Sequence, residues 1–204
     1  LYISEMIPKI IHQTWKTSNL DNNLKKWSNS WKLQNFEYKF YDDNNCLELV
    51  KNYYPQYLNL YLSVSTIEKA DIFRYLVLHK YGGFYCDIDT ECIGPIEEII
   101  GMSTFITGIE YYQPLQYLQW FIASSAGNNI LIEMMSEIIK RQSFKCFLSK
   151  YIKIYWSTGP ILFTDVLLKT KEDYKVLKKG ELGCYDTKIR PKYLIHHFKG
   201  SWKY

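Results

Sequence analysis

The sequence lacks the features of a membrane-spanning chain. Its 204 residues contain no apolar run of about 18 residues, the length at which a transmembrane helix becomes a candidate. The first residues also lack the basic, apolar and small-residue order of a signal peptide. We therefore expect no membrane span in this chain. A Golgi-type lumen is an alternative location if an N-terminal anchor precedes it.

The chain also lacks a strong charge of one sign. Its 25 basic and 21 acidic residues give a net charge of +4, and no run of five or more like charges occurs. A nucleic-acid-binding protein needs a concentrated basic surface. We therefore expect no nucleic-acid partner, whereas a small phosphate-bearing ligand is compatible with this balance.

Cysteine pairs of the C-x-x-C type are absent. The cysteines, five in number, are Cys46, Cys86, Cys92, Cys146 and Cys184. An odd number of cysteines without a secretory context indicates a reducing compartment. The sequence therefore predicts a cytoplasmic location.

Aromatic residues, in contrast, are plentiful. They make up 17% of the chain, which contains 19 tyrosines. Tyrosine and tryptophan suit surfaces that are partly apolar and partly hydrogen-bonding, such as sugar or nucleobase sites. A general bias toward Lys, Asn, Ile and Tyr explains the same number equally well. The 47% hydrophobic share is enough for one domain with a sizeable core.

Helical and extended patterns alternate along the chain. Strands are predicted over residues 9–15, 36–41, 84–86, 103–109 and 120–125 and near residue 193, and helices over residues 22–33, 46–53, 65–81, 129–141 and 161–169. Such alternation is typical of an α/β fold with a largely parallel sheet. Ligands bind these sheets beyond the carboxyl ends of the strands, where residues 12–15 and 87–89 are expected to lie.

Two aspartates, Asp87 and Asp89, follow an apolar strand. Alternate residues of an extended chain point to one side, about 6.6 Å apart. Both carboxylates are therefore expected to face one spot, while Ile88 faces into the packing. Converging carboxylates repel unless a cation lies between them, and oxygen ligands favour Mg²⁺ or Mn²⁺. A solvated acidic turn explains this short motif equally well.

A phosphohydrolase of the haloacid-dehalogenase type is an alternative, because these enzymes also carry a D-x-D motif at a strand end. In such an enzyme Asp87 would be the nucleophile. The chemistry also needs a later acidic pair to hold Mg²⁺. None of the later aspartates, Asp165, Asp173 and Asp186, follows an apolar strand in a suitable motif, so this alternative is the weaker one.

The best-marked helix, residues 65–81, begins at a capping box and ends at two glycines. Its expected solvent face carries Glu68, Lys69, His79 and Lys80. Asp71 and Arg74 instead fall in the apolar stripe, where an acid and a base are costly unless they are paired or bind a ligand. A buried ion pair that braces the helix and a contact to sugar hydroxyls and phosphate are both consistent with this pattern.

Residues 69–89, KADIFRYLVLHKYGGFYCDID, resemble the central signature of the family 32 glycosyltransferases, a group of D-x-D sugar transferases. Residues 7–15 (IPKIIHQTW) resemble the opening strand of that family, and residues 38–43 its second strand. The T-G-P turn at residues 158–160 and the H-x-x-x-G-S-W pattern at residues 196–202 resemble its later motifs. The resemblance spans nearly the whole chain and is weakest over residues 110–154.

The resemblance implies a single GT-A domain over residues 1–204, with a Rossmann-like, mostly parallel sheet flanked by helices. Residues 1–110 would bind the nucleotide sugar, and residues 111–204 would form the acceptor side and the closing C-terminal part. The implied reaction is a retaining transfer of a hexose from GDP-mannose or a UDP-sugar to a hydroxyl of a glycan, lipid or protein. The implied cofactor is Mn²⁺, or Mg²⁺. A catalytically silent sugar-binding module is a further alternative.

Site residues follow from the same resemblance. It implies catalytic roles for Asp87, Asp89 and Arg74, and a metal site formed by Asp87, Asp89 and His196. The implied donor-binding residues are His12, Gln13, Thr14, Trp15, Asp71, Arg74, Tyr75, Gly82, Gly83, Asp87, Ile88, Gly159 and Trp202. Attack from the leaving-group face needs no carboxylate nucleophile. In a double-displacement alternative, Glu110 or Asp165 would act as nucleophile or base.

Overall fold

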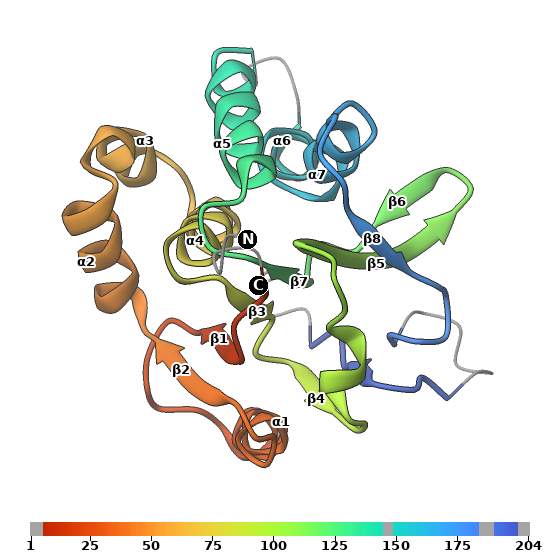
Figure 1. Cartoon of the computed structure of the whole chain (residues 1–204). Helices are drawn as coiled ribbons and strands as arrows, with labels where there is room; N and C mark the ends of the chain where they lie inside the picture. The colour runs from red at the N-terminus through yellow and green to blue at the C-terminus, as the bar shows by residue number, and fades with distance from the viewer. Residues whose placement is uncertain (1–5, 145–148, 184–189, 200–204) are drawn as a thin grey trace.

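A seven-stranded sheet lies at the centre of the part of the chain that the structure describes (Figure 1). The structure, a computed structural model, describes residues 6–144, 149–183 and 190–199. The strands of this sheet are β1 (Ile10–Thr14), β2 (Glu37–Tyr41), β3 (Gly83–Cys86), β5 (Phe105–Tyr112), β6 (Leu115–Tyr117), β7 (Phe121–Ser124) and β8 (Lys175–Leu177). Their order is β2-β1-β3-β7-β5-β6, with β8 paired to β5. A separate two-stranded sheet pairs β4 (Thr90–Cys92) with β9 (Leu194–His196).

The sheet is parallel where the two predicted ligand-binding strands lie. β1 runs parallel to both β2 and β3, and β8 runs parallel to β5. β7 is antiparallel to both β3 and β5, and β5 and β6 form an antiparallel hairpin. The predicted α/β fold is confirmed, with the parallel strands β2, β1 and β3 on one side of the sheet, and β1 and β3 end side by side.

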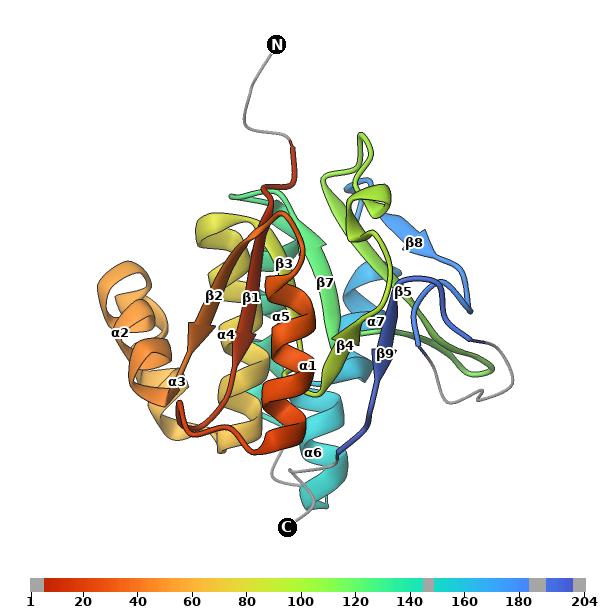
Figure 2. The ribbon, with the colours of Figure 1, turned by 90° about the horizontal axis from the view of Figure 1, so that it is seen from below.

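Both faces of the sheet are covered (Figures 1 and 2). One face carries α2 (Asp43–Tyr53), α3 (Leu58–Ser63), α4 (Thr66–Tyr81), α5 (Asn129–Gln142), α6 (Lys150–Ser157) and α7 (Pro160–Leu167). The other carries α1 (Asn22–Lys32) and the β4–β9 sheet. Short 3-10 turns lie at Pro55–Tyr57 and Ile96–Ile99. Among the described residues, we find no helix with the length and apolar character that a bilayer crossing requires.

The two faces hold two separate apolar clusters, because strand residues alternate between them. Tyr85 packs in the cluster under α4 and α5, whereas its neighbours Phe84 and Cys86 pack in the cluster under α1. Trp31 of α1 is fully buried in the second cluster, and its indole Nε1 donates to the carbonyl of Thr90 at 3.0 Å. This bond joins α1 to the strand that follows the D-x-D pair.

The turn between α4 and β3 requires its two glycines. Gly82 caps α4 with φ of +64°, and Gly83 follows with φ of +99°, in a region that L-residues rarely adopt. A Cβ on Gly83 would lie 2.4 Å from the carbonyl oxygen of Ile10 on β1. The glycines therefore allow β3 to lie directly beside β1, with the D-x-D pair at the far end of β3.

α4 is more deeply buried than its sequence predicted. Glu68, expected on the solvent face, is only 4% exposed. Its carboxylate accepts hydrogen bonds from Ser65, Gln142 and Ser157. The prediction was wrong because α6, to which Ser157 belongs, was not predicted and covers this part of α4.

Candidate active site

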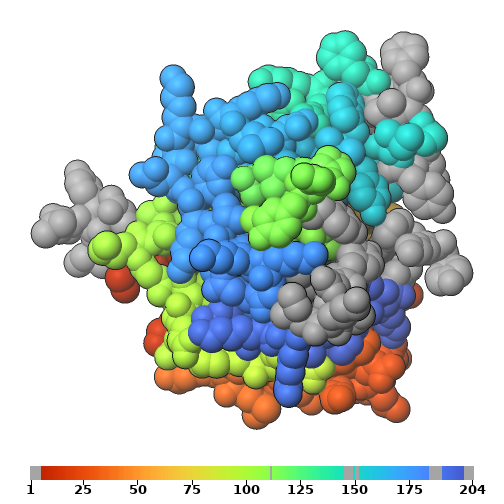
Figure 3. Space-filling model, turned by 90° about the vertical axis from the view of Figure 1, so that its right-hand side faces the viewer, coloured from red at the N-terminus to blue at the C-terminus, as the bar shows by residue number. Residues whose placement is uncertain are grey.

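A pairing between β4 and β9 brings residues distant in the sequence to the D-x-D pair. Thr90 pairs with His196 across this small sheet, and the backbone N–H of His197 donates to the carbonyl of Asp89 at 2.9 Å. Figure 3 shows the deep-blue segment around β9 running along the lime segment around β4. The pairing therefore places His196 beside Asp89.

Asp87, Asp89 and His196 form a group able to hold a metal ion, since one ligand atom from each lies within 4.8 Å of the others. Nε2 of His196 lies 3.1 Å from Oδ1 of Asp89, and the backbone N–H of Lys199 donates to Oδ2 of Asp89 at 2.9 Å. Nδ1 of His196 is buried and has no hydrogen-bond partner among the described residues. Carboxylate oxygens with an imidazole nitrogen suit Mn²⁺, so the donor set fits a divalent cation.

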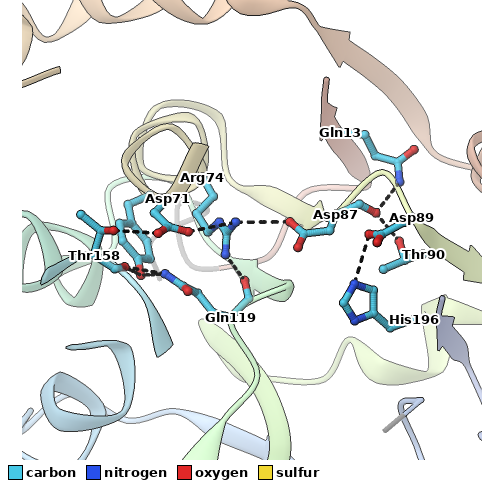
Figure 4. A network of polar contacts seen from close by, with 10 residues as sticks. Gln13, Asp71, Arg74, Asp87, Asp89, Thr90, Gln119, Thr158 and His196 are labelled. Atoms are coloured by element: carbon cyan, nitrogen blue, oxygen red, sulfur yellow. Dashed lines mark hydrogen bonds and ion pairs between the residues drawn. The ribbon is translucent and has the colours of Figure 1, made fainter. Parts of the chain in front are cut away.

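The D-x-D pair lies in a tight turn between β3 and β4 (Figure 4). Oγ1 of Thr90 donates to the carbonyl of Asp87 at 2.6 Å, and Nε2 of Gln13 donates to the same carbonyl at 3.1 Å. The N–H of Asp87 donates to the carbonyl of Trp120 at 2.9 Å. The extended geometry predicted for residues 87–89 was wrong, because the N–H of Thr90 donates to the carbonyl of Asp87 at 3.1 Å and closes a turn. Ile88 packs inside, as expected, with 4% exposure.

Arg74 joins this turn to helix α4 (Figure 4). Its Nη2 lies 3.2 Å from Oδ1 of Asp71 and 3.3 Å from Oδ1 of Asp87. Its Nη1 donates to the carbonyl of Gln119 at 2.9 Å, and its Nε has no hydrogen-bond partner among the described residues. Arg74 and Asp71 are 6% and 5% exposed. Asp71 and Arg74 therefore form a buried ion pair.

Burial and charge set the protonation of these groups. Burial raises the pKa of Asp71 to about 7, although the charge of Arg74 and the hydrogen bond from Thr158 oppose it. Burial also raises the pKa of Asp87, against the charge of Arg74. Burial alone would raise the pKa of Asp89 as well, but the bonds from His196 and Lys199 lower it overall. Asp89 is therefore the carboxylate that stays ionised most readily.

Two residues that support Asp71 were not predicted. Oγ1 of Thr158 donates to Oδ2 of Asp71 at 2.7 Å. Nε2 of Gln119 donates to the carbonyl of Thr158 at 2.7 Å and to the hydroxyl of Tyr75 at 2.6 Å. The T-G-P turn was the sequence signal for Thr158, whereas Gln119 had none.

A cavity of about 250 Å³ lies beside this cluster, close to the lower end of ligand pockets, which run from roughly 300 to 1,000 Å³. It is lined by Ile67, Asp71, Arg74, Asp87, Glu110, Gln116, Tyr117, Gln119, Trp120, Ile154, Tyr155, Gly159, Pro160, His196 and Phe198. The lining comes from α4, the D-x-D turn, the β5–β6 hairpin, the connection between β6 and β7, the α6–α7 junction and the C-terminal segment. Charged, amide and aromatic groups thus converge from six parts of the chain.

Some predicted site residues lie at this cavity and others only near it. The predicted residues in the lining are Asp71, Arg74, Asp87, Gly159 and His196. Gln13 is buried and contacts the D-x-D turn. Thr14 and Trp15 are half-buried at the end of β1 and do not belong to the lining. Trp202 lies outside the described residues.

His12, Tyr75, Gly82 and Gly83, which were also predicted to bind the donor, do not belong to the lining of this cavity. The ring of His12 is fully buried, and its nitrogens contact the carbonyl of Gly82 at 2.9 Å and the hydroxyl of Tyr41 at 3.0 Å. Tyr75 is 0% exposed. The two glycines lie at the start of β3, the end opposite the D-x-D pair. The side chains of His12 and Tyr75 are therefore packed in the interior of the protein, and the two glycines pack against residues 8–12.

The two carboxylates of the double-displacement alternative lie in different places. Asp165 is paired with Arg141 at 2.7 Å and is not in the cavity lining. Glu110 lines the cavity and is 5% exposed. Oε2 of Glu110 accepts a hydrogen bond from Nε1 of Trp120 at 2.8 Å. Of the two, therefore, Glu110 alone is in a position to meet a ligand.

Known proteins show a matching sequence region. Residues 9–106 match the family model described as the glycosyltransferase sugar-binding region containing a DXD motif. Inositol phosphoceramide mannosyltransferase 3 of Schizosaccharomyces pombe is 29% identical over 169 residues, which cover 80% of this chain and 45% of that protein. The initiation-specific alpha-1,6-mannosyltransferase of Candida albicans is 28% identical over an alignment of 282 positions. This alignment covers 98% of this chain and 73% of that protein. The chain thus spans about half the length of several curated relatives.

A solved structure shows the same fold. The PaToxG glycosyltransferase superposes with a TM-score of 0.62 at 20% identity, over 81% of this chain and 70% of that chain. At this identity the match shows the GT-A fold alone. The family model and the named relatives, independently of this structural match, support the resemblance to the family 32 glycosyltransferases.

Proposed function

We propose that this chain transfers a hexose from a nucleotide-sugar donor to a hydroxyl of a glycan, lipid or protein acceptor, with retention of the anomeric configuration. The observation that carries the proposal is the group Asp87, Asp89 and His196, which lies beside a cavity that also contains Asp71 and Arg74. The relatives are named mannosyltransferases, which favours mannose as the hexose. GDP-mannose is therefore the first donor to test, and UDP-sugars are the second.

Asp87, Asp89 and His196 would hold a divalent cation, which we assign as Mn²⁺ or Mg²⁺. When bound, such an ion supplies positive charge to a diphosphate as it gains negative charge on leaving. Asp89 suits this role because its lowered pKa keeps its carboxylate ionised. The N–H of Lys199 holds the second oxygen of Asp89, and such outer contacts orient a metal ligand.

Arg74 is placed to act on both the donor and the metal-binding turn. Its buried guanidinium keeps its charge, because the carboxylates beside it raise its pKa against the effect of burial. The contact with Asp87 fixes the orientation of that carboxylate. The guanidinium lines the cavity, where its charge can meet a phosphate or sugar oxygen. We assign Arg74 to stabilising negative charge on the departing diphosphate.

Asp71 is assigned to the hydroxyl groups of the donor sugar. Thr158 and Arg74 each occupy one side of its carboxylate, and a carboxylate accepts about four hydrogen bonds. The remaining lone pairs are available to sugar hydroxyls. Because its pKa is about 7, Asp71 also exists in a protonated form near neutral pH, in which it can donate a hydrogen bond.

The acceptor hydroxyl would attack the anomeric carbon from the face on which the diphosphate leaves. The bond from the anomeric carbon to the acceptor oxygen forms as the bond to the phosphate oxygen breaks, and a phosphate oxygen takes the hydroxyl proton. This route requires no protein nucleophile. The pairing of Asp165 with Arg141 outside the cavity lining is consistent with that.

A thermal-shift screen of nucleotide sugars with and without Mn²⁺ tests the proposal. We expect one nucleotide sugar to raise the melting temperature, only with Mn²⁺ present, in the wild type and in Asp173→Asn, whose carboxylate is exposed and outside the cavity. Asp89→Asn should abolish the shift. A shift that is equal without the ion, or none with any donor, would contradict the proposal.

A further inference from the structure

Glu110 is a buried carboxylate that the proposed metal and donor contacts leave unused. It lies on β5, is 5% exposed and lines the same cavity as Asp71 and Arg74. No basic side chain forms an ion pair with it in the described part of the chain. Burying a carboxylate without a cation is costly, so this position needs an explanation beyond packing.

β5 is irregular where it carries Glu110. The register between β5 and β6 shifts between Ile109 and Tyr111. Such irregularities redirect one side chain out of the regular alternation of a strand. The redirected residue here is Glu110, and its carboxylate reaches the cavity.

Trp120 donates a hydrogen bond to one oxygen of the Glu110 carboxylate and makes none to the other. Its indole Nε1 donates to Oε2 of Glu110 at 2.8 Å. The same indole stacks on the ring of His196, with 4.7 Å between the ring centroids. Oε1 of Glu110 has no hydrogen-bond partner in the described residues. Trp120 therefore separates Glu110 from the proposed metal ligand and orients its free oxygen.

The groups beside Glu110 in the lining are polar and aromatic. Gln116 and Tyr117 of the β5–β6 hairpin and Tyr155 of α6 line the cavity with it. Carboxylate, amide and phenol groups next to aromatic rings are suited to a molecule that presents several hydroxyls. Asp71, Arg74 and Asp87 already account for the donor side.

We infer that Oε1 of Glu110 accepts a hydrogen bond from a hydroxyl of a polyol acceptor, a sugar or a cyclitol. This inference rests on the proposed function and adds to it the residue that selects the acceptor. Glu110 is thus an acceptor-binding residue, held in place by Trp120.

The test compares Glu110→Gln with the wild type. The glutamine oxygen can still accept from Trp120, which leaves an NH₂ donor where the free oxygen was. Glu97→Gln is the control, because Glu97 is exposed and pairs with Lys9 away from the cavity. The probes are methyl α-D-mannopyranoside and myo-inositol, with a nucleotide sugar and Mn²⁺. The readouts are release of nucleoside diphosphate without acceptor and formation of the transfer product.

We expect Glu110→Gln to raise the KM for the accepted polyol at least about tenfold, the loss typical of a misplaced polar contact. Donor hydrolysis without acceptor should fall by a smaller factor than the KM for the polyol rises, because the lost contact is made to the acceptor and not to the donor. Glu97→Gln should match the wild type in both readouts.

Three results would overturn this inference. They are an unchanged KM in Glu110→Gln, a loss of donor hydrolysis in that variant at least as large as the rise in KM, and donor hydrolysis by the wild type without transfer to either polyol. A wild type that hydrolyses no nucleotide sugar contradicts instead the proposed function itself. The hydrolysis readout therefore separates the two failures.

Discussion

The side chains of His196 and Asp89 meet at 3.1 Å, although 107 residues separate them in the chain. Two short strands make this contact, β4 directly after the D-x-D pair and β9 ending at His196. The fold thus completes the proposed metal-binding group with a residue from the C-terminal part of the chain. The first prediction follows from this contact.

Replacing His196 by alanine should weaken Mn²⁺ binding at least about tenfold, since losing a ligand costs more than losing the outer contacts that support one. Isothermal titration of Mn²⁺ into the protein measures the change. His79→Ala is the matched control, because His79 lies on α4 with its Nδ1 near the hydroxyl of Tyr54. Equal Mn²⁺ affinity in His196→Ala and His79→Ala would contradict the ligand assignment.

Replacing Arg74 by lysine should reduce kcat about 100-fold, a loss typical of removing one group that stabilises transition-state charge. A lysine ammonium cannot contact Asp71, Asp87 and the Gln119 carbonyl together as the guanidinium does. Steady-state kinetics with the accepted donor check this.

Arg141→Lys is the comparison for this variant. Arg141 is equally buried, but it holds Glu137, Asp165 and the Trp156 carbonyl in the helical layer. This change should lower the melting temperature and leave the kcat of the folded enzyme near wild type. A similar loss of kcat in both variants would mean that Arg74 acts through stability.

Protein stability should fall between pH 6.5 and pH 4 because of His12. Burial lowers the pKa of His12 to about 4, against an ordinary value of 6.5. In this window the unfolded chain binds a proton at His12 that the folded protein does not, so the free energy of unfolding rises with pH. The full effect corresponds to about 3 kcal/mol.

Urea unfolding at pH 4.5, 5.5, 6.5 and 7.5 measures how the free energy of unfolding depends on pH. The His12→Gln variant should show a weaker dependence on pH, whether or not its stability at neutral pH differs from that of wild type. His79, whose pKa is also lowered by burial, contributes in the same direction and serves as a second site to substitute. An identical slope in His12→Gln and wild type would contradict the assignment to His12.

Replacing Gly83 by alanine should destabilise the fold by at least about 2 kcal/mol, because backbone strain and a steric clash coincide there. The residue has φ of +99°, and its new Cβ would lie 2.4 Å from the carbonyl oxygen of Ile10. Gly101→Ala is the control, since a Cβ there would meet nothing within 4 Å. Chemical denaturation of both variants decides the matter, and equal midpoints would refute the close approach of β3 to β1.

The sequence predicted those parts of the site that lie on one regular element. Asp71 and Arg74 fall in the apolar stripe of a helix with clear ends, so their burial followed from the helical period. Asp87 and Asp89 follow a short apolar strand, and their convergence was expected although the turn geometry was not. The metal role of His196 came from a family resemblance, because a lone histidine near a strand end has no periodic signal.

The remaining parts depend on contacts that leave no pattern in the sequence. The strand predicted near residue 193 is β9 (Leu194–His196), but its pairing with β4 was not predicted, because the three residues of β4 are too few for an alternation to be recognised. Thr158 acts through a hydrogen bond to Asp71, and Gln119 acts through hydrogen bonds to the Thr158 carbonyl and the Tyr75 hydroxyl. The prediction that Glu68 faces solvent was wrong for a similar reason, since only the tertiary structure shows that α6 covers it.

The central claim is that Asp87, Asp89 and His196 hold the cation on which sugar transfer depends. The most direct measurement is nucleoside diphosphate release from GDP-mannose and UDP-sugars as Mn²⁺ is titrated, in wild type, Asp89→Asn and Asp173→Asn. We predict that wild type and Asp173→Asn release nucleotide from one donor in proportion to bound Mn²⁺, and that Asp89→Asn, although folded, releases none. Turnover in Asp89→Asn equal to wild type, or release that does not depend on Mn²⁺, would contradict the account.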